Sequence, residues 1–126
     1  MAVTELRREE LSASECRRTG EVLARVGDKW TVQVIFELGE GSRRFNELRR
    51  AITGVSQRML TLTLKNLERD GLVSRTVTAS VPPRVDYALT DLGLSMLAPV
   101  RALGDWAAAH IPQMDAARLR YDDADR

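Results

Sequence analysis

Two adjacent prolines, Pro82 and Pro83, are the feature that most limits what this chain of 126 residues can fold into. A proline has no backbone N–H group to donate to a β-ladder, so the pair must lie outside any paired strand. The segments on either side, 72–78 (LVSRTVT) and 84–90 (RVDYALT), are rich in residue types that favour strands. We therefore predict a β-hairpin in which residues 79–83 form the loop.

A helix-turn-helix pattern comes immediately before this hairpin. A short helix is predicted over residues 46–52, and Ser56 is a favourable N-cap for a second helix that ends at Gly71. The second helix carries one narrow apolar stripe, formed by Leu60, Leu64 and Leu67. Its opposite side is polar and cationic, as expected for a helix that buries one face and presents the other to a ligand.

Further helices are predicted from residues that can cap a helix N-terminus. They begin after Ser12, Asp28 and Thr90, each of which has a side-chain oxygen suited to that position. We expect Pro99 to kink the last of these helices, because a proline inside a helix removes a hydrogen bond. The segment after Pro112 is expected either to fray or to add one short helix.

The order of these elements is that of a winged helix-turn-helix domain, which is mainly α with a small β-hairpin wing. The length of the chain suits a single domain with one modest core. We predict one domain over residues 1–126, with its core at about 20–110. Residues 1–12 and 113–126 are then arms or tails.

Positive charge is concentrated in the helix-turn-helix and the hairpin. Residues 43–84 contain nine Lys or Arg and three acidic residues, a charge of +6, whereas the whole chain carries only +1. A cationic centre with acidic flanks indicates one basic face suited to a polyanion such as double-stranded DNA. Charge alone leaves a second interpretation open, an ordinary solvated surface.

Three segments occur in an order and spacing that resemble one known family: GDKW (27–30), RRFNELRRAITGVSQRMLTLTLKNLERDGLV (43–73) and VPPRVDYALTDLG (81–93). They resemble the HxlR-type regulators, bacterial winged-helix transcription factors related to the MarR proteins. The resemblance implies a homodimer on a palindromic or near-palindromic operator, with recognition helices in successive major grooves and wings along the backbone or the minor groove. It also implies that the N-terminal and C-terminal helices form the dimer interface, with candidates Leu23, Leu92, Met96, Val100, Leu103 and Trp106.

Candidate DNA contacts come from the second helix of the motif and from its surroundings. Gln57, Arg58 and Thr61 are the candidates for reading base edges, with Ser56 as the cap beside them. Leu62 either contacts a thymine methyl group or packs in the core or at its rim. The candidates for phosphate contacts are Arg43, Arg44, Arg49, Arg50, Lys65, Arg75 and, on the wing, Arg84.

Cys16 is the only cysteine, so no disulfide can form within one chain, as is usual in a reducing cytoplasm. Its predicted place in the first turn of a helix, next to Arg17 and Arg18, favours the reactive thiolate form. Some HxlR-type regulators sense oxidants through a cysteine near this position, which makes Cys16 the candidate sensor of an oxidant or electrophile. Two alternatives stay open. The first is that the thiol is partly buried and inert. The second is a regulator with a ligand pocket among its outer helices, which Trp30 and Trp106 would line unless they pack in the core.

The sequence offers little for catalysis, metal binding or membrane insertion. His110, the only histidine, is expected at a helix end, and the sequence has no Cys/His cluster or glycine-rich phosphate loop. We therefore predict a non-enzyme without metal or cofactor. No apolar run approaches the roughly 20 residues of a membrane helix and the N-terminus is charged, so we expect a cytoplasmic protein without membrane contact. An alternative of another class is a winged helix used for protein–protein contact, against which the cationic helix face argues.

Overall fold

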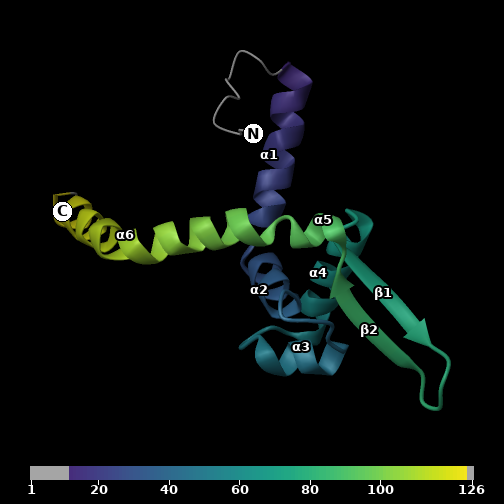
Figure 1. Cartoon of the computed structure of the whole chain (residues 1–126). Helices are drawn as coiled ribbons and strands as arrows, with labels where there is room; N and C mark the ends of the chain where they lie inside the picture. Colours follow the sequence, from purple (N-terminus) through teal and green to yellow (C-terminus); the bar gives the residue numbers. More distant parts are fainter. Residues whose placement is uncertain (1–11, 125–126) are drawn as a thin grey trace.

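The structure is a computed structural model that describes residues 12–124, so the predicted arm at 1–12 lies outside the described residues apart from Ser12. Within that range the elements follow in the order α1 (Ala13–Val26), α2 (Lys29–Leu38), α3 (Phe45–Ala51), α4 (Gln57–Arg69), β1 (Val73–Thr78), β2 (Arg84–Leu89), α5 (Asp91–Leu94) and α6 (Leu97–Ala124). This order confirms the predicted winged helix-turn-helix architecture, mostly helical with one hairpin (Figure 1).

Capping side chains set where the first two helices begin. Ser12 Oγ accepts a hydrogen bond from the backbone N–H of Glu15 at 3.2 Å. The Asp28 carboxylate accepts from the backbone N–H groups of Trp30 and Thr31, both at 3.1 Å. These bonds satisfy N–H groups that have no partner within a helix, and both helices begin where the sequence predicted.

The core lies where α2, α3, α4 and the base of the hairpin meet. The apolar stripe predicted on α4 packs against α2, which is central and largely apolar. The buried cluster consists of Val34, Ile35, Leu38, Leu48, Ile52, Val55, Leu60, Leu64, Leu67, Leu72 and Val73. Each Leu or Ile that is fully buried contributes about 1.5–3 kcal/mol. This packing fixes the orientation of α4, so its opposite face is turned to solvent.

The turn between α3 and α4 depends on a glycine and a cap. Gly54 has a φ angle of +85°, a left-handed conformation that residues with a Cβ atom adopt rarely. Two residues later, Ser56 Oγ accepts a hydrogen bond from the backbone N–H of Met59 at 3.0 Å. Helix α4 therefore begins directly after Ser56, as predicted.

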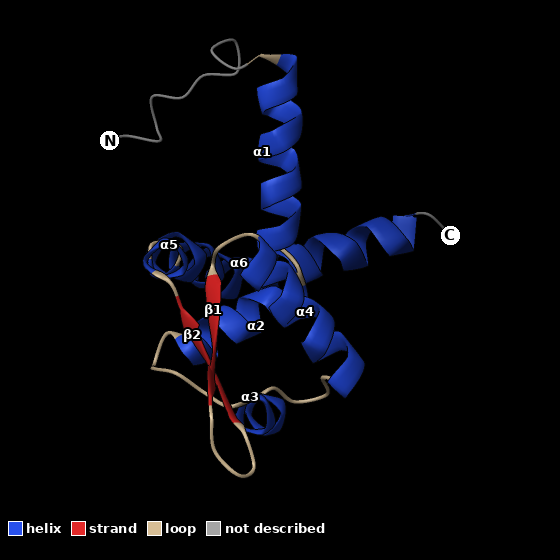
Figure 2. Ribbon diagram, turned by 90° about the vertical axis from the view of Figure 1, so that its right-hand side faces the viewer, coloured by secondary structure: helices blue, strands red, loops and turns tan. Residues whose placement is uncertain are grey.

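Strands β1 and β2 form the predicted antiparallel hairpin, which extends from the pair Val73–Leu89 at the core out to the tip (Figure 2). The proline-containing loop, residues 79–83, lies outside the ladder. Arg43 adds an isolated bridge to this hairpin: its N–H donates to the Tyr87 carbonyl at 2.9 Å, and its carbonyl accepts from the Tyr87 N–H at 2.8 Å. The bridge fixes β2 to the segment that leads into α3.

The C-terminal region differs from the prediction of one helix kinked at Pro99. A separate short helix, α5, precedes α6, and Pro99 is the third residue of α6. A backbone N–H at that position has no partner within the helix, so the proline costs no hydrogen bond. Helix α6 then continues through Pro112 and bends along its length, as helices with an internal proline commonly do (Figure 1). His110 therefore lies inside a helix and not at its end.

Helices α1 and α6 extend away from the core, and α1 and the tip of the hairpin point in opposite directions (Figures 1 and 2). None of the described residues of α1 is buried, and Val100 is the only one in α6 that is. With 28 residues, α6 is roughly 42 Å long. Across residues 12–124, none of the helices combines the length and apolar character needed to cross a bilayer.

Candidate nucleic-acid interface

Helix α4 presents a ridge of exposed side chains on the side opposite the core. Its members follow at spacings of three or four residues, which places them on one helix face: Arg58, Leu62, Lys65 and Arg69. Leu62 is 49% exposed, so it does not pack in the core. Gln57 is exposed in the first turn, and Thr61 is half-buried on the flank towards the hairpin. The predicted base-reading residues therefore lie at the N-terminal half of an uncovered helix face, where the positive end of the helix dipole also favours anions.

Helix α3 and the segment before it supply a second group of cations. Arg49 and Arg50 are exposed in the last turn of α3, and Arg44 is exposed at its N-cap position. Arg43 differs from these three residues, because it is half-buried and its guanidinium lies 3.7 Å from the Glu40 carboxylate. Together with its backbone bridge, this pairing gives Arg43 a structural role at the base of the hairpin.

The hairpin contributes the remaining cations of the predicted set. Arg75 is exposed in the middle of β1, and Arg84 begins β2 near the tip. Arg84 Nε lies 3.0 Å from Asp86 Oδ2, so part of its charge is balanced within the strand. Helix α3 and the tip of the hairpin lie at the end of the molecule opposite α1 (Figures 1 and 2). The cations of α3 and of the hairpin are therefore separated from the uncovered helix α1.

A second surface, which we call the apolar surface, consists of exposed apolar side chains on α1, α5 and α6. Leu23 is 63% and Leu103 is 61% exposed, and Leu92 and Trp106 are also exposed. Of the predicted dimer residues, Met96 is half-buried and Val100 is only 5% exposed, and both line the groove within this surface. Four further exposed apolar residues of α6 were not predicted: Ile111, which precedes Pro112, and Met114, Leu119 and Tyr121, which lie in the segment expected to be a tail.

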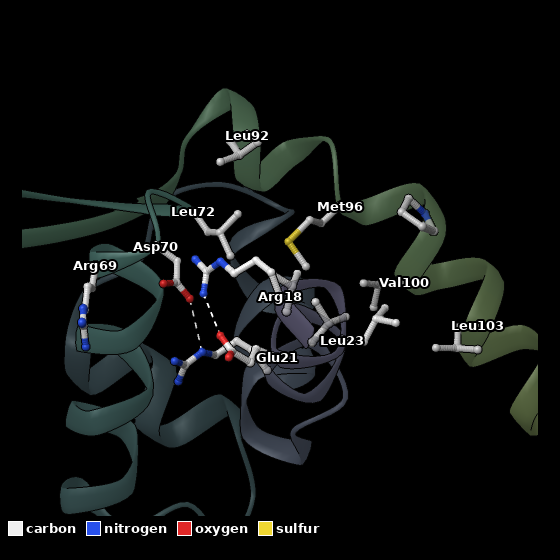
Figure 3. A pocket seen from close by; sticks show the side chains of 14 residues that line it. Arg18, Glu21, Leu23, Arg69, Asp70, Leu72, Leu92, Met96, Val100 and Leu103 are labelled. Atoms are coloured by element: carbon white, nitrogen blue, oxygen red, sulfur yellow. Dashed lines mark hydrogen bonds and ion pairs between the residues drawn. The ribbon is translucent and has the colours of Figure 1, made fainter. Parts of the chain in front are cut away.

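A groove of about 800 Å³ lies within the apolar surface, between α1, the end of α4 and the α5–α6 region (Figure 3). Leu23, Met96 and Val100 contribute to its apolar walls (Figure 3). Two ion pairs lie at its rim, Arg18–Glu21 at 3.0 Å and Arg25–Asp70 at 3.2 Å, the second of which joins α1 to the end of α4. Neither tryptophan lines this groove, contrary to the predicted ligand pocket: Trp30 packs against the core and Trp106 is exposed on α6.

Cys16 lies in the first turn of α1, where its thiol is free and exposed. The alternative of an inert thiol therefore cannot rest on burial within the chain, and the reactivity of Cys16 stays a prediction. Arg17 and Arg18 are its neighbours in sequence, although Arg18 forms an ion pair with Glu21. Within the part of the chain that the structure describes, no three His, Cys, Asp or Glu side chains gather as metal ligands would.

Known proteins share both the sequence pattern and the fold. Residues 25–115 match the model of the HxlR-like helix-turn-helix family. The HTH-type transcriptional regulator YtfH of Escherichia coli is 41% identical over 114 residues, which are 90% of each chain. The structure of the transcriptional regulator ytfH from Salmonella typhimurium is similar, with a TM-score of 0.71 and 42% identity over 79% of this chain and 89% of that one. The redox regulator HypR in its reduced form gives a TM-score of 0.72 and 35% identity, over 79% and 98% of the two chains.

Proposed function

We propose, from the premise that this chain belongs to the HxlR-like helix-turn-helix family of transcriptional regulators, that it binds an operator as a homodimer and responds to oxidants through Cys16. Its relatives are regulators of transcription and not enzymes. The observation that carries the proposal is the separation of two surfaces. The cations of α3 and of the hairpin lie away from α1, whose Val22 and Leu23 are exposed.

Helix α4 is the proposed recognition helix. An exposed arginine can bond the O6 and N7 atoms of guanine together, and Arg58 lies in the first turn, the part of a recognition helix that contacts base edges. Gln57 and Thr61 flank it. Arg44, Arg49 and the other cations around the motif are suited to phosphates, which fix the register of a protein on the duplex without reading its sequence.

The apolar surface is the proposed dimer interface. An isolated helix of 14 residues is marginal in water, and α1 buries none of its described residues within the chain. Exposed apolar side chains gathered around a groove, as Leu23, Leu92 and Leu103 are, mark an interaction site in soluble proteins. A second copy that covers α1, α6 and the groove between them would bury Leu23, Leu103 and Trp106. A twofold dimer carries two copies of α4, which is why we propose a palindromic operator. We also propose that the protein acts in the cytoplasm.

We expect binding to DNA to depend steeply on salt. A protein that contacts about six to ten phosphates releases the counterions condensed on them when it binds. Raising the salt concentration from about 50 to 200 mM therefore weakens its binding by roughly a thousandfold or more. Fluorescence anisotropy with the DNA upstream of the protein's own coding region, and with a shuffled duplex as control, measures this dependence. A protein–protein module would instead show weak binding to both duplexes at every salt concentration.

We expect the oxidant diamide to release the wild-type protein from its operator and to leave Cys16→Ser bound. Diamide takes two electrons and two protons from two thiols, and the product is a disulfide. One cysteine per chain means that the disulfide joins two Cys16 residues of a dimer, or Cys16 and a small thiol. Gel shifts with and without diamide, followed by non-reducing electrophoresis, distinguish these products. Equal release of both proteins would exclude Cys16 as the sensor.

A further inference from the structure

We propose that the cleft between α4 and the hairpin binds one phosphate of the DNA backbone. The cleft has a volume of about 380 Å³ and is lined by Thr61, Leu64, Lys65, Glu68, Arg75 and Tyr87. Four of these side chains carry a positive charge or a hydroxyl group, which are the groups that bind phosphate oxygens in protein–DNA complexes. The inference rests on the proposed function, since it requires DNA along α4. It adds Tyr87 and Glu68 to the interface.

The pairing of the hairpin brings Arg75 and Tyr87 together. They are directly opposite each other in the ladder, so their side chains lie on the same face of the hairpin. The backbone of Tyr87 exchanges both of its hydrogen bonds with Arg43, on the side away from β1. Arg75 and Tyr87 therefore form a cross-strand pair without backbone hydrogen bonds between them. In an antiparallel ladder, the two side chains of such a pair lie closer together than those of a hydrogen-bonded pair.

Arg75 is exposed at the edge of the core. Two residues before it, Val73 lies on the same face and is buried in the core, and Tyr87 packs against that core as well. In the described part of the chain, no acidic group lies within ion-pair distance of Arg75 or of Lys65, which approaches from α4. Two cations on facing walls of one cleft, neither paired with an acid, indicate an external anion as their common partner.

Glu68 is the one acidic residue in the cleft, one helical turn after Lys65 on α4. Its carboxylate reduces the positive charge of the cleft and repels a phosphate that enters it. We assign to Glu68 the role of limiting the affinity for DNA of any sequence. The cleft thus contains residues that favour phosphate binding and one that opposes it, and substitutions within it should change affinity in opposite directions.

The test measures binding to a fluorescein-labelled, mixed-sequence DNA duplex over a series of salt concentrations. We expect Lys65→Gln and Arg75→Gln each to reduce the slope of log affinity against log salt, together by about one per subunit because the two cations share one phosphate, and Arg75→Lys to keep it. Tyr87→Phe keeps the ring and removes only the hydroxyl, so we expect about tenfold weaker binding with an unchanged slope. Glu68→Gln is expected to strengthen binding.

Arg118→Gln is the matched control, because it removes an exposed charge on α6, an element that does not line the cleft. It should leave the slope unchanged. If the wild-type protein shows no salt-dependent binding, the proposed function itself fails. A steep wild-type slope that Lys65→Gln and Arg75→Gln do not change would overturn the phosphate site alone. Weaker binding by Glu68→Gln would equally contradict the role given to that residue.

Discussion

The double substitution Leu23→Asp and Leu103→Asp is expected to convert the dimer into a monomer and to lower operator affinity by roughly two to four orders of magnitude. Both leucines are more than half exposed in the single chain, so aspartate at these positions costs little within one subunit. In a dimer that buries them, four unpaired carboxylates would have to leave water, at a cost of several kcal/mol each. The large loss of affinity follows because a monomer contacts only one half-site.

Sedimentation velocity measures the change of mass, and anisotropy on the operator measures the change of affinity. The matched control is Val77→Asp, an equivalent change at an exposed apolar residue of the hairpin, outside the apolar surface. We expect this control to sediment as a dimer. Near-ultraviolet circular dichroism, to which the core-packed Trp30 contributes, tests whether the double variant keeps its folded core. A double variant that remains dimeric would place the interface elsewhere.

The central part of the fold was predictable because its determinants are local. Ser56 is followed by an apolar stripe with helical spacing, and both the cap and the burial of that stripe are present in the structure. Pro82 and Pro83 have no backbone donors, and the hairpin loop lies where that property requires. In each case the covalent properties of one or two residues decide the local structure, whatever surrounds them.

The C-terminal region was harder to predict, because the effect of a proline depends on where its helix begins. Pro99 would kink a helix that started at Thr90, but it costs nothing in a helix that starts only two residues before it. That start depends on tertiary packing: at Gly93 a Cβ atom would overlap the backbone carbonyl of Leu72, so only glycine allows this close approach of α5. A contact between residues so far apart in the chain has no local signal in the sequence.

The candidate site was predictable as a helix face but not as a cleft. Helical spacing was enough to place Arg58 and Lys65 on the uncovered side of α4. Tyr87 was not among the predicted site residues. Its position opposite Arg75 follows from the hairpin register, and the sequence contains that signal once the loop is located. The approach of α4 to that face, which creates the cleft, is a tertiary property.

The second large effect is expected at Arg58, for which alanine should weaken binding to the operator by roughly 5- to 150-fold, equivalent to about 1–3 kcal/mol. Binding to a shuffled duplex should change little. The reason is that an arginine bonded to a guanine edge contributes only when that guanine is present, whereas phosphates are the same in every sequence. Arg58 is exposed in the first turn of α4, so the substitution leaves no cavity and should leave the thermal unfolding midpoint nearly unchanged.

Arg49→Ala provides the comparison that separates base reading from charge. Arg49 is exposed in the last turn of α3, outside the groove of the proposed dimer interface, and is a candidate for phosphate contact. Removal of either arginine lowers the charge of the chain by one, so a purely electrostatic role predicts similar losses for both variants on both duplexes. Base reading predicts that only Arg58→Ala reduces the ratio of operator affinity to shuffled-duplex affinity. Equal losses on the two duplexes would assign Arg58 to the phosphates and leave Gln57 and Thr61 as the remaining candidates for base contact.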